Sequence, residues 1–473
     1  MKNLIDAMRQ KDTLTANGAV THSTSLSECV NLFFLAGAAR RMSESDIILL
    51  FSRAMSENTA LAYQILFWAR DCRGGAGEKR FFQVIAKYLS THSDEDIRID
   101  DWNSLAIFVQ DFGSWKDVFV IESPDYNNLN YLSVQLEEHE NANLLAKWFP
   151  RNGPWFVAMH KYLGKSPKAF RKYLVKKSST VEQMICAGMT HSVDYSTVPS
   201  VAMNKYRNFF GKVDGARFNQ FNQDVLDGKE KVNASVLFPH ELYQAIEQGD
   251  DEKAVEAQWS SLTNYMEGSE ERILPVCDVS GSMMGLPLEV CVSLGLYISE
   301  RNEGIFRDAF ITFSEHPKMC YVQGDTLAER MRNLSDASWG YNTNLEATFS
   351  VLLDRAKSES LPQSEMPTKL LIISDMEFDE GTVSGSTNLE MIKREYTAAG
   401  YEIPQLIFWN VAGRLGNVPS SAHETSVGLV SGFSPAILST ILQGEVTTPH
   451  QLMLDAVDTE KYRAVTSFLR SRV

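Results

Sequence analysis

The chain has 473 residues, of which 44% are hydrophobic and 22% charged, and its formal net charge at pH 7 is −15. This length and composition are typical of a water-soluble globular protein with two or three domains. No apolar run approaches eighteen residues and the N-terminus lacks a signal-peptide core, so the sequence speaks against membrane-spanning and secreted proteins and favours a cytoplasmic location.

The first half of the chain predicts an almost entirely helical domain. Apolar residues recur at three-to-four spacing, with short polar or Gly-containing joints between the segments. Consecutive short helices of this kind stack as helical hairpins in a solenoid, so we predict a HEAT-like helical-repeat domain over residues 1–270, although no crisp sequence period supports the repeat. The predicted helices are Leu26–Ala39, Ser45–Met55, Asn58–Ala69, Glu78–Leu89, Asp101–Gln110, Trp115–Ile121, Asn141–Trp148 and Gly153–Tyr162.

A glycine-rich joint, Arg70-Asp-Cys-Arg73-Gly-Gly-Ala-Gly-Glu-Lys79-Arg80, lies between two of these helices. Its glycines favour a turn that ends the first helix. Its backbone amides, flanked by Arg73, Lys79 and Arg80, also offer a cradle for a phosphate. The joint is not a Walker loop, because the Gly-Lys-Ser/Thr ending is absent.

One basic segment stands out in this acidic chain: residues 141–235 hold 15 Lys and Arg against 6 Asp and Glu. Ser166-Pro167 is a good helix start, and the helix that follows puts cations on one face and apolar residues on the other. Cations interleaved with aromatic rings favour nucleic-acid binding, through phosphate contacts and base stacking. The candidate residues in this segment are Lys168, Arg171, Lys172, Lys176, Lys205 and Arg207.

Two other interpretations of the basic segment remain open. In the first, it is a solvated helix face whose aromatic residues Phe170, Tyr206 and Phe209 belong to the core. In the second, it docks on the acidic second half, since residues 271–473 hold 16 Lys and Arg against 26 Asp and Glu.

The second half predicts a mainly parallel sheet covered by helices on both faces. Buried-type apolar runs alternate with amphipathic stretches, and we place this α/β domain at residues 271–444. A helical extension over 445–473 follows, in which Thr448-Pro449 starts a final helix that reaches about Ser467 and packs back on the first half. The predicted strands are Ile273–Cys277, Asp308–Ser314, Lys369–Ser374, Gln405–Asn410 and Ser426–Ser431, and the predicted helices are Leu288–Ser299, Asn344–Ala356 and Pro435–Leu442.

Three separate stretches of this domain predict one metal site. They are Asp278-Val-Ser280-Gly-Ser282 after the first strand, Thr343 in Gly-Tyr-Asn-Thr-Asn, and Asp375 at the end of a second buried strand. Mg²⁺ or Mn²⁺ prefers such carboxylate and hydroxyl oxygens, and ligands of open α/β sheets bind at the carboxyl ends of strands. An Asp-x-Ser-x-Ser string alone is also typical of an ordinary turn.

The pattern resembles the metal-ion-dependent adhesion site of von Willebrand factor A domains. The resemblance implies that Asp278, Ser280, Ser282 and Thr343 are direct or water-bridged ligands of Mg²⁺ and that Asp375 acts mostly through water. It also implies a partner whose Asp or Glu completes the coordination.

Over nearly the whole chain, further motifs resemble an uncharacterised family of plants, bacteria and large viruses that joins a helical half to a von Willebrand factor A domain. These motifs are Arg70–Arg80, Asp194–Arg207, Val232–His240, Val276–Met283, Ser374–Asp379 and Leu429–Ser434. The architecture is also similar to the Ro (TROVE) ribonucleoproteins, whose ring of helical repeats binds structured and misfolded RNA.

Catalysis finds little support in the sequence. Ser280 and Ser282 lack a Gly-x-Ser-x-Gly elbow, and His160, His191 and His240 stand alone. The six cysteines are isolated, which speaks against structural zinc and a disulfide framework. We therefore predict a non-catalytic, Ro-like RNA-binding scaffold with a Mg²⁺ site, the alternative being a protein-interaction adaptor without RNA.

Overall fold

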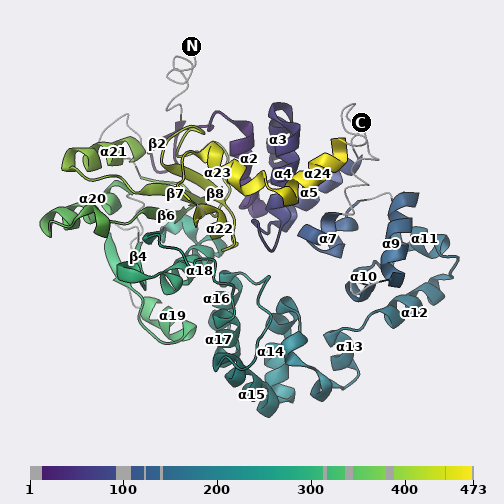
Figure 1. Ribbon diagram of the computed structural model, residues 1–473. Helices are drawn as coiled ribbons and strands as arrows, with labels where there is room; N and C mark the ends of the chain where they lie inside the picture. Colours follow the sequence, from purple (N-terminus) through teal and green to yellow (C-terminus); the bar gives the residue numbers. More distant parts are fainter. Residues whose placement is uncertain are drawn as a thin grey trace.

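The computed structural model describes residues 13–91, 108–121, 124–138, 142–312, 317–335, 345–379, 388–442 and 444–470. The first half is helical apart from a small hairpin of β1 (Thr13–Leu14) and β2 (Val20–Thr21), which confirms the predicted class (Figure 1). Its helices are α2 (Glu28–Ala36), α3 (Glu44–Glu57), α4 (Thr59–Arg70), α5 (Lys79–Thr91), α7 (Val109–Phe112), α8 (Trp115–Val118), α9 (Tyr126–Glu138), α10 (Ala142–Trp148), α11 (Gly153–Tyr162), α12 (Pro167–Lys177), α13 (Val181–Cys186), α14 (Ser200–Val213), α15 (Gly215–Leu226), α16 (Pro239–Glu247) and α17 (Glu252–Ser260).

The second half is built on a six-stranded mixed sheet in the order β5-β4-β3-β6-β7-β8. Neighbouring strands run parallel except β5, which pairs antiparallel with β4 at one edge. The chain adds strands on one side of β3 and then on the other, so the order reverses between β3 and β6. The strands are β3 (Ile273–Cys277), β4 (Ala309–Thr312), β5 (Lys318–Tyr321), β6 (Lys369–Ser374), β7 (Gln405–Asn410) and β8 (Val427–Ser431).

Burial explains why these runs form strands. Every residue of β3, β6 and β8 is buried. Because successive side chains of a strand point to opposite faces, uniform burial means that both faces of the sheet are covered. The helices of this half are α18 (Leu286–Arg301), α19 (Leu327–Ser335), α20 (Leu345–Ser358), α21 (Asn388–Ala399), α22 (Ile437–Leu442), α23 (Pro449–Val457) and α24 (Glu460–Arg470).

The two halves share one hydrophobic core. Helix α2 packs on β8, where the hydroxyl of Ser431 donates to the carbonyl of Phe33 at 2.8 Å. The segment before α2 lies along the sheet's loops, since the backbones of His22 and Val418 exchange hydrogen bonds. At the other end of the chain, α23 and α24 pack on α4. The predicted return of the C-terminal extension to the first half is therefore observed.

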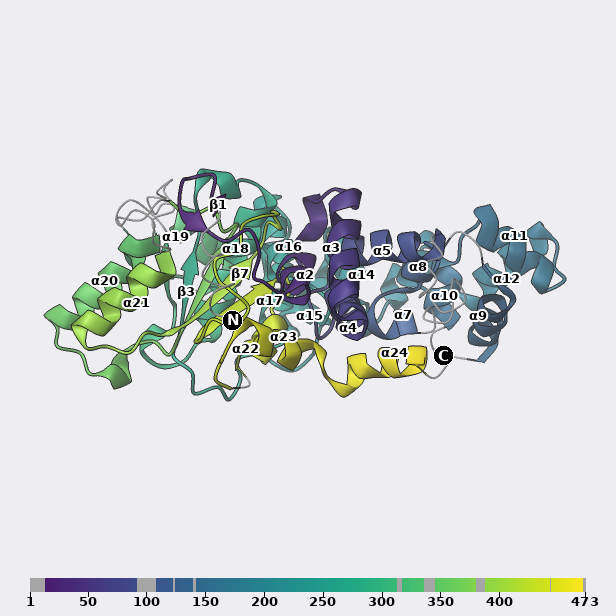
Figure 2. The ribbon, with the colours of Figure 1, turned by 90° about the horizontal axis from the view of Figure 1, so that it is seen from above.

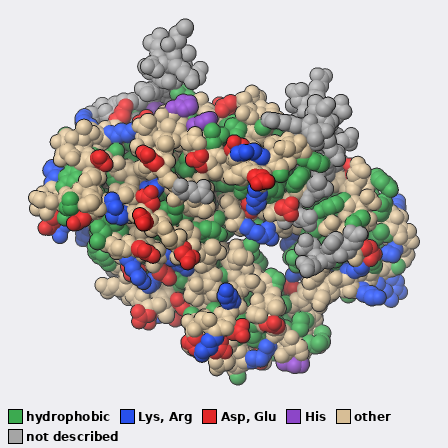
Figure 3. Space-filling model, in the orientation of Figure 1, with side chains coloured by type: hydrophobic (Ala, Val, Ile, Leu, Met, Phe, Trp, Pro, Cys, Tyr) green, Lys and Arg blue, Asp and Glu red, His purple; other side chains and the backbone are tan. Residues whose placement is uncertain are grey.

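The helical half extends away from the sheet and curves back to it (Figures 1 and 2). It leaves through α3–α5, turns at α9–α13, and returns through α14–α17, with a second small core around Phe210 and Phe218. The space-filling view shows a hollow inside this curve with Lys and Arg side chains near its rim (Figure 3). We call this hollow the opening. Among the described helices, none has the length and apolar character needed to cross a membrane.

Several predicted bounds differ from the structure. The helix Tyr126–Glu138 was not predicted because its sequence is rich in Asn and polar residues, and the edge strand β5 was missed because it is partly exposed. The predicted final helix is two helices, since α23 ends at Val457 and is capped by Asp458, whose amide donates to the carbonyl of Leu454. Most of the predicted helix Asp101–Gln110 lies outside the described residues; its last two residues begin α7.

Candidate metal centre and cationic opening

The predicted metal ligands lie at the point where the strand order reverses. Asp278 follows β3 and Asp375 follows β6, and these two parallel strands are neighbours. The amide of Asp278 donates to the carbonyl of Ile373 at 3.0 Å, which fixes the two strand ends side by side. In open α/β sheets this is where ligands bind. Asp278, Ser280, Ser282 and Asp375 are thus brought to one place, whereas Thr343 lies outside the described residues.

The carboxylate of Asp278 is fully buried and held by hydrogen bonds. Its Oδ2 accepts from the hydroxyl of Ser374 at 2.5 Å, and its Oδ1 accepts from the amide of Ser280 at 3.0 Å. The hydroxyl oxygens of Ser280 and Ser282 lie 3.1 Å apart. Four oxygen atoms of the kind that Mg²⁺ prefers therefore belong to the single short segment 278–282.

Asp375 shares its neighbourhood with one cation from the next loop. Arg414 approaches Oδ2 of Asp375 at 3.2 Å and Oε1 of Glu377 at 3.3 Å, while the amide of Glu377 donates to Oδ1 of Asp375 at 3.1 Å. The approach of Arg414 to Asp375 is an ion pair without an aligned hydrogen bond. Oδ2 of Asp375 is consequently a buried oxygen that no hydrogen bond satisfies.

Burial and like charge act together on these two carboxyl groups. Burial raises the pKa of Asp278 to about 6, and the charge of Asp375 adds to this shift. Burial also raises the pKa of Asp375, against the opposing effect of Arg414. Two buried carboxylates side by side with an unsatisfied oxygen fit a bound divalent cation, because the cation supplies the positive charge that both groups lack.

The chemistry of the donor set also agrees with a hard cation. Within the described chain, no three His, Cys, Asp or Glu side chains are grouped so that they could hold a metal ion, so hydroxyls and water would have to complete the set. All six cysteines are free, and Cys277 and Cys291 are buried in the core. The oxygen donors of Asp278, Ser280 and Ser282 fit Mg²⁺ or Mn²⁺ better than they fit zinc.

The glycine-rich joint does not form the predicted phosphate cradle. The carboxylate of Asp71, fully buried, accepts from the amides of Arg73 at 3.0 Å and Gly74 at 3.2 Å. The amides of Gly75 and Gly77 donate to the backbone carbonyl of Asp71, both at 3.1 Å. The anion that these amides bind is a side chain of the protein itself, so an external phosphate has no free donors there.

The three cations of this joint have separate roles. Arg80 donates to the carbonyls of Ala39 and Met42, at 3.2 and 2.6 Å, and so supports a turn of the backbone. Arg73 is exposed and lies near the carbonyl of Asp111 at 3.4 Å. Lys79 is exposed at the start of α5. Of the three, Arg80 has one guanidinium nitrogen engaged by the backbone, and its role as a nucleic-acid contact stays a prediction.

The basic stripe forms as predicted on α12. Ser166 caps this helix by accepting from the amide of Ala169 at 3.2 Å, and Phe170 and Leu174 are buried beneath it. Tyr173, half-buried, donates to Glu137 at 2.7 Å. The stripe's own residues, Lys168, Arg171, Lys172 and Lys176, are exposed. Because Phe170 is a core residue, this face offers cations for contacts with a nucleic acid but no aromatic ring for stacking.

Arg207 is wrong as a nucleic-acid contact. It is buried in α14, forms an ion pair with Asp250, and donates to Gln258 at 2.8 Å. No local pattern indicates this burial, because Asp250 lies 43 residues further on. Its neighbour Lys205 is exposed, with its ammonium 5.0 Å from the ring centre of Tyr206.

The structure adds three residues that the sequence did not single out. Lys116 of α8 lies 3.5 Å from the ring centre of Trp148 of α10, and Lys147 lies 4.8 Å from the same ring. Trp148 is 37% exposed. Cations around an accessible indole ring form the kind of surface on which a nucleic-acid base stacks. No sequence signal could have found this cluster, because it joins two short helices about thirty residues apart.

Three lysines from three other helices act on Lys116. The pKa of Lys116 is lowered, first by partial burial and then by the positive charges of Lys79, Lys147 and Lys205. Lys147 pairs with Glu182 at 2.7 Å. In the part of the chain that the structure describes, the other three have no ion-pair partner. The helices α5, α8, α10 and α14 thus bring like charges together, which costs energy unless an anion binds.

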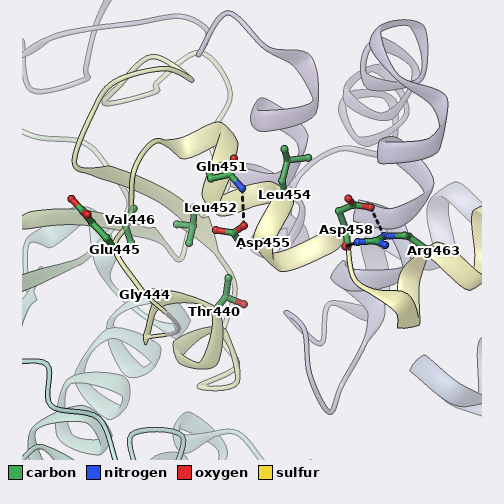
Figure 4. Close-up of a pocket in the computed structure, with 10 residues that line it drawn as sticks. All are labelled: Thr440, Gly444, Glu445, Val446, Gln451, Leu452, Leu454, Asp455, Asp458 and Arg463. Carbon is green, nitrogen blue, oxygen red and sulfur yellow. Dashed lines mark hydrogen bonds and ion pairs between the residues drawn. The ribbon is translucent and has the colours of Figure 1, made fainter.

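The other features have structural explanations. His240 is buried between aromatic rings, and Nδ1 of His160 lies 3.0 Å from the carbonyl of Lys165, so both are structural histidines as predicted. A pocket of about 510 Å³ beside α22 and α23 has acidic walls (Figure 4). Its Asp455 accepts from Gln451 at 2.8 Å and its Asp458 accepts from Arg463 at 2.8 Å, so these carboxylates are already engaged.

Comparisons with known proteins place the chain among uncharacterised relatives. Residues 158–271 match a domain of unknown function, DUF2828, and residues 272–468 match a second one, DUF7788. Uncharacterized protein L728 of Acanthamoeba polyphaga mimivirus is 29% identical over 504 residues, which cover 94% of this chain and 87% of that protein. Among solved structures, the chain is similar in architecture to the Ro (RSR) protein of Deinococcus radiodurans, with 14% identity, a TM-score of 0.44, and coverage of 89% of this chain and 100% of that one.

Proposed function

We propose that the protein is a non-catalytic RNA-binding scaffold, with its helical half as the RNA-binding part. In this proposal the helical half is a HEAT-like array, comparable to the ring of a Ro ribonucleoprotein. The second half is a von Willebrand factor A domain that holds Mg²⁺ or Mn²⁺. The scaffold acts in the cytoplasm on structured or single-stranded RNA.

The convergence of Lys79, Lys147 and Lys205 on Lys116 carries the RNA proposal. Their positive charges are the cause that, after burial, lowers the pKa of Lys116. A phosphate backbone would neutralise these charges, and Trp148 would offer a surface for one base. The stripe of α12 and Arg73 extend the cationic surface, whereas Arg207 does not belong to it.

The metal site supports the second part of the proposal. Asp278 and Asp375 would hold the cation together with Ser280, Ser282 and Thr343, and Asp375 would act mostly through water. The cation would supply a Lewis-acidic position for an oxygen ligand. A partner's carboxylate at that position would make the protein an interaction adaptor, and this is the alternative to the RNA proposal.

The same residues support a binding role over a catalytic one. The hydroxyls of Ser280 and Ser282 are bonded to each other, and no histidine contacts either of them within the described chain. A hydrolase would need a positioned base or nucleophile pair. Purified protein with Mg²⁺ or Mn²⁺ is expected not to hydrolyse nucleotides, phosphodiesters or peptides. Turnover that disappears in Asp278→Ala would overturn the non-catalytic proposal.

The RNA proposal is tested by removing the charges at the opening. In the triple variant Lys79→Gln/Lys116→Gln/Lys205→Gln, we expect weaker binding of a single-stranded RNA and a smaller salt dependence, by about 0.7 in slope for each phosphate that the variant no longer neutralises. The affinity of the full-length variant is measured over a series of salt concentrations. The α12 variant Lys168→Gln/Arg171→Gln/Lys172→Gln/Lys176→Gln serves as the comparison and should weaken binding less per charge removed.

Three outcomes separate the alternatives. Trp148→Ala should weaken RNA binding by about 1–3 kcal/mol without changing the salt slope, because it removes stacking and not charge. Asp278→Ala should leave RNA affinity unchanged, because the metal loops lie in the other half. If the triple variant binds RNA as tightly as the parent, the opening is not an RNA site and the adaptor alternative leads.

A further inference from the structure

A cationic pocket lies next to the metal loops, at the junction of the two halves. Its volume is about 200 Å³. One wall comes from the turn η1 (Ala39–Arg41), and the opposite wall from the start of α18 and the loop after β7. Ser282 lines it too, so the pocket and the predicted metal site share a residue. The side chains that give the pocket its character are Arg40, Arg41, Ser282, Arg414 and Phe433.

The three arginines differ in how far they are already neutralised. Arg40 pairs with the buried Glu78 at 3.1 Å and lies 4.3 Å from the ring centre of Phe433. Arg414 pairs with Asp375 and Glu377. Arg41 is exposed and has no carboxylate partner among the residues that the structure describes. One guanidinium in this pocket is therefore free to bind an anion.

The fold holds these arginines in place from both halves. Arg80 of α5 donates to the carbonyls of Ala39 and Met42, on either side of the arginine pair, and so fixes the turn. On the other wall, Gly413 has a φ of +59° and passes so close that a Cβ there would lie 2.5 Å from the carbonyl oxygen of Ala38. No residue with a side chain fits this contact without displacing the turn.

Charge balance links the pocket to the metal site. Arg414 pairs with Asp375 and Glu377, and Arg40 pairs with Glu78 and also acts on Glu241, whereas Arg41 has no carboxylate partner among the described residues. A divalent cation bound by Asp278 and Asp375 would add two positive charges beside Arg41 and Arg414. The pocket would then attract an anion more strongly.

We propose that this pocket binds a phosphoryl group, either free phosphate or a phosphate monoester, with Arg41 and Arg414 as its main contacts. Guanidinium groups bind phosphate through paired hydrogen bonds, and Mg²⁺ in proteins commonly shares its coordination with a phosphate oxygen. A tetrahedral anion with several terminal oxygens can contact both arginines and the metal. A single carboxylate has only two oxygens and cannot reach all three.

The coupling to Mg²⁺ and the availability of Arg414, which pairs with Asp375, rest on the proposed metal site, whereas the contact with Arg41 does not. Phosphate affinity should rise when Mg²⁺ is bound, and by linkage Mg²⁺ affinity should rise by the same factor when phosphate is bound. Neither half alone contains all three arginines, so the full chain is required.

The test is calorimetric titration of full-length protein with inorganic phosphate, with and without saturating MgCl₂, after correction for the magnesium phosphate complex in solution. We expect Arg41→Gln to weaken phosphate binding by roughly tenfold or more, since it removes a charge-assisted contact. Arg53→Gln is the matched control, because Arg53 is an exposed arginine on α3 that does not line the pocket. Acetate is titrated in parallel.

Each result has a defined meaning. Phosphate binding that depends on Arg41 and exceeds acetate binding supports the proposal. Absence of phosphate binding, equal binding by Arg41→Gln, or acetate binding as tight as phosphate binding overturns it. If the parent binds phosphate through Arg41 but titration shows no Mg²⁺ binding, the phosphate site is supported and the metal site is refuted. If Mg²⁺ binds and phosphate does not, the metal site is supported and the phosphate site is refuted.

Discussion

Two loops of this protein carry a buried aspartate and several glycines, and they use their polar atoms in opposite ways. In the loop after α4, Asp71 accepts from two backbone amides, from Lys461, and from the hydroxyl of Tyr462 at 2.9 Å. In the loop after β3, Asp278 accepts from one amide and one hydroxyl and faces a second carboxylate, Asp375.

The difference separates a structural loop from a ligand-binding loop. Both aspartates are fully buried, so exposure does not distinguish them. The distinguishing feature is whether neighbouring groups satisfy the hydrogen bonds of each carboxylate and balance its charge. Asp71 has a cation of the same chain beside it and is complete. Asp278 and Asp375 repel each other. Among the described residues, Arg414 is the one cation shown beside Asp375 and Glu377, with Oδ2 of Asp375 in an ion pair but without a hydrogen bond, so an added cation would balance the remaining charge.

The largest loss of stability is expected when the loop after α4 loses the carboxylate of Asp71. Asp71→Ala should lower the free energy of unfolding by about 3 kcal/mol, because it leaves buried donors unpaired. Lys461 is 44% exposed, and solvent offsets its part of the loss. Urea denaturation measures the change. Asp354→Ala on α20, where the side chain is 75% exposed, is the control, and equal destabilisation by both variants would contradict the structural role of Asp71.

A glycine-to-alanine substitution in each loop sharpens the contrast between the two loops. A Cβ at Gly75 would lie 2.0 Å from the carbonyl oxygen of Trp68, whereas a Cβ at Gly281 has open space around it. Gly75→Ala should therefore cost up to about 3 kcal/mol, as overpacking does, and Gly281→Ala less than about 0.5 kcal/mol. Thermal unfolding of the two variants is the measurement. Similar melting temperatures would show that the first loop tolerates displacement.

Added Mg²⁺ tests directly whether the loop after β3 binds a cation. At a concentration a hundredfold above its Kd, Mg²⁺ should raise the free energy of unfolding of the parent by about 2.7 kcal/mol. In Asp278→Ala this increase should vanish while the fold remains. Melting temperatures in MgCl₂ and in NaCl of the same ionic strength measure the effect. An equal magnesium-dependent rise in the variant would remove the site assignment.

His240 is a third buried polar group, and it is incomplete in a different way. Its Nδ1 has no hydrogen-bond partner, and burial lowers its pKa to about 3, with a smaller contribution from Arg40. Above pH 6.5 the ring is neutral in both the folded and unfolded states. Below that, only the unfolded state takes up the proton, so this group's share of stability is lost as pH falls from 6.5 towards 3.

At pH 5 this loss amounts to about 2 kcal/mol. His240→Phe keeps a ring beside Phe433 and removes the titration, so its free energy of unfolding should depend less on pH between 5 and 6.5 than that of the parent. Urea titrations at the two pH values give the comparison. The same pH dependence in both proteins would assign the acid sensitivity to other groups.

Much of the α/β half could be predicted because local sequence determines it. Strands β3, β6 and β7 have the predicted bounds, since fully buried strands are continuous apolar runs. The motif residues Asp278 and Asp375 directly follow two of these strands, so their meeting follows from the sheet. The metal itself stays a prediction, as does the role of Thr343.

The rest depends on contacts between distant parts of the chain. The glycine-rich joint is filled by Asp71, whose partners include the distant Lys461, so its own segment does not predict this. In the same way, Arg207 is buried because it pairs with the distant Asp250. The cluster of lysines at the opening joins four helices. The distribution of charge along the sequence indicated a basic region, but it did not show which lysines and arginines lie close together in the fold.

The contact between α2 and β8 has a consequence for the order in which the protein is made. The carbonyl of Phe33 meets the hydroxyl of Ser431, and 398 residues separate the two. During translation, α3 and α4 can cover part of α2 early, since the ring of Phe33 lies 4.3 Å from that of Trp68 of α4, but the face that packs on β8 waits until most of the chain has been made. A nascent chain that stalls before residue 427 leaves this apolar face of α2 without its strand.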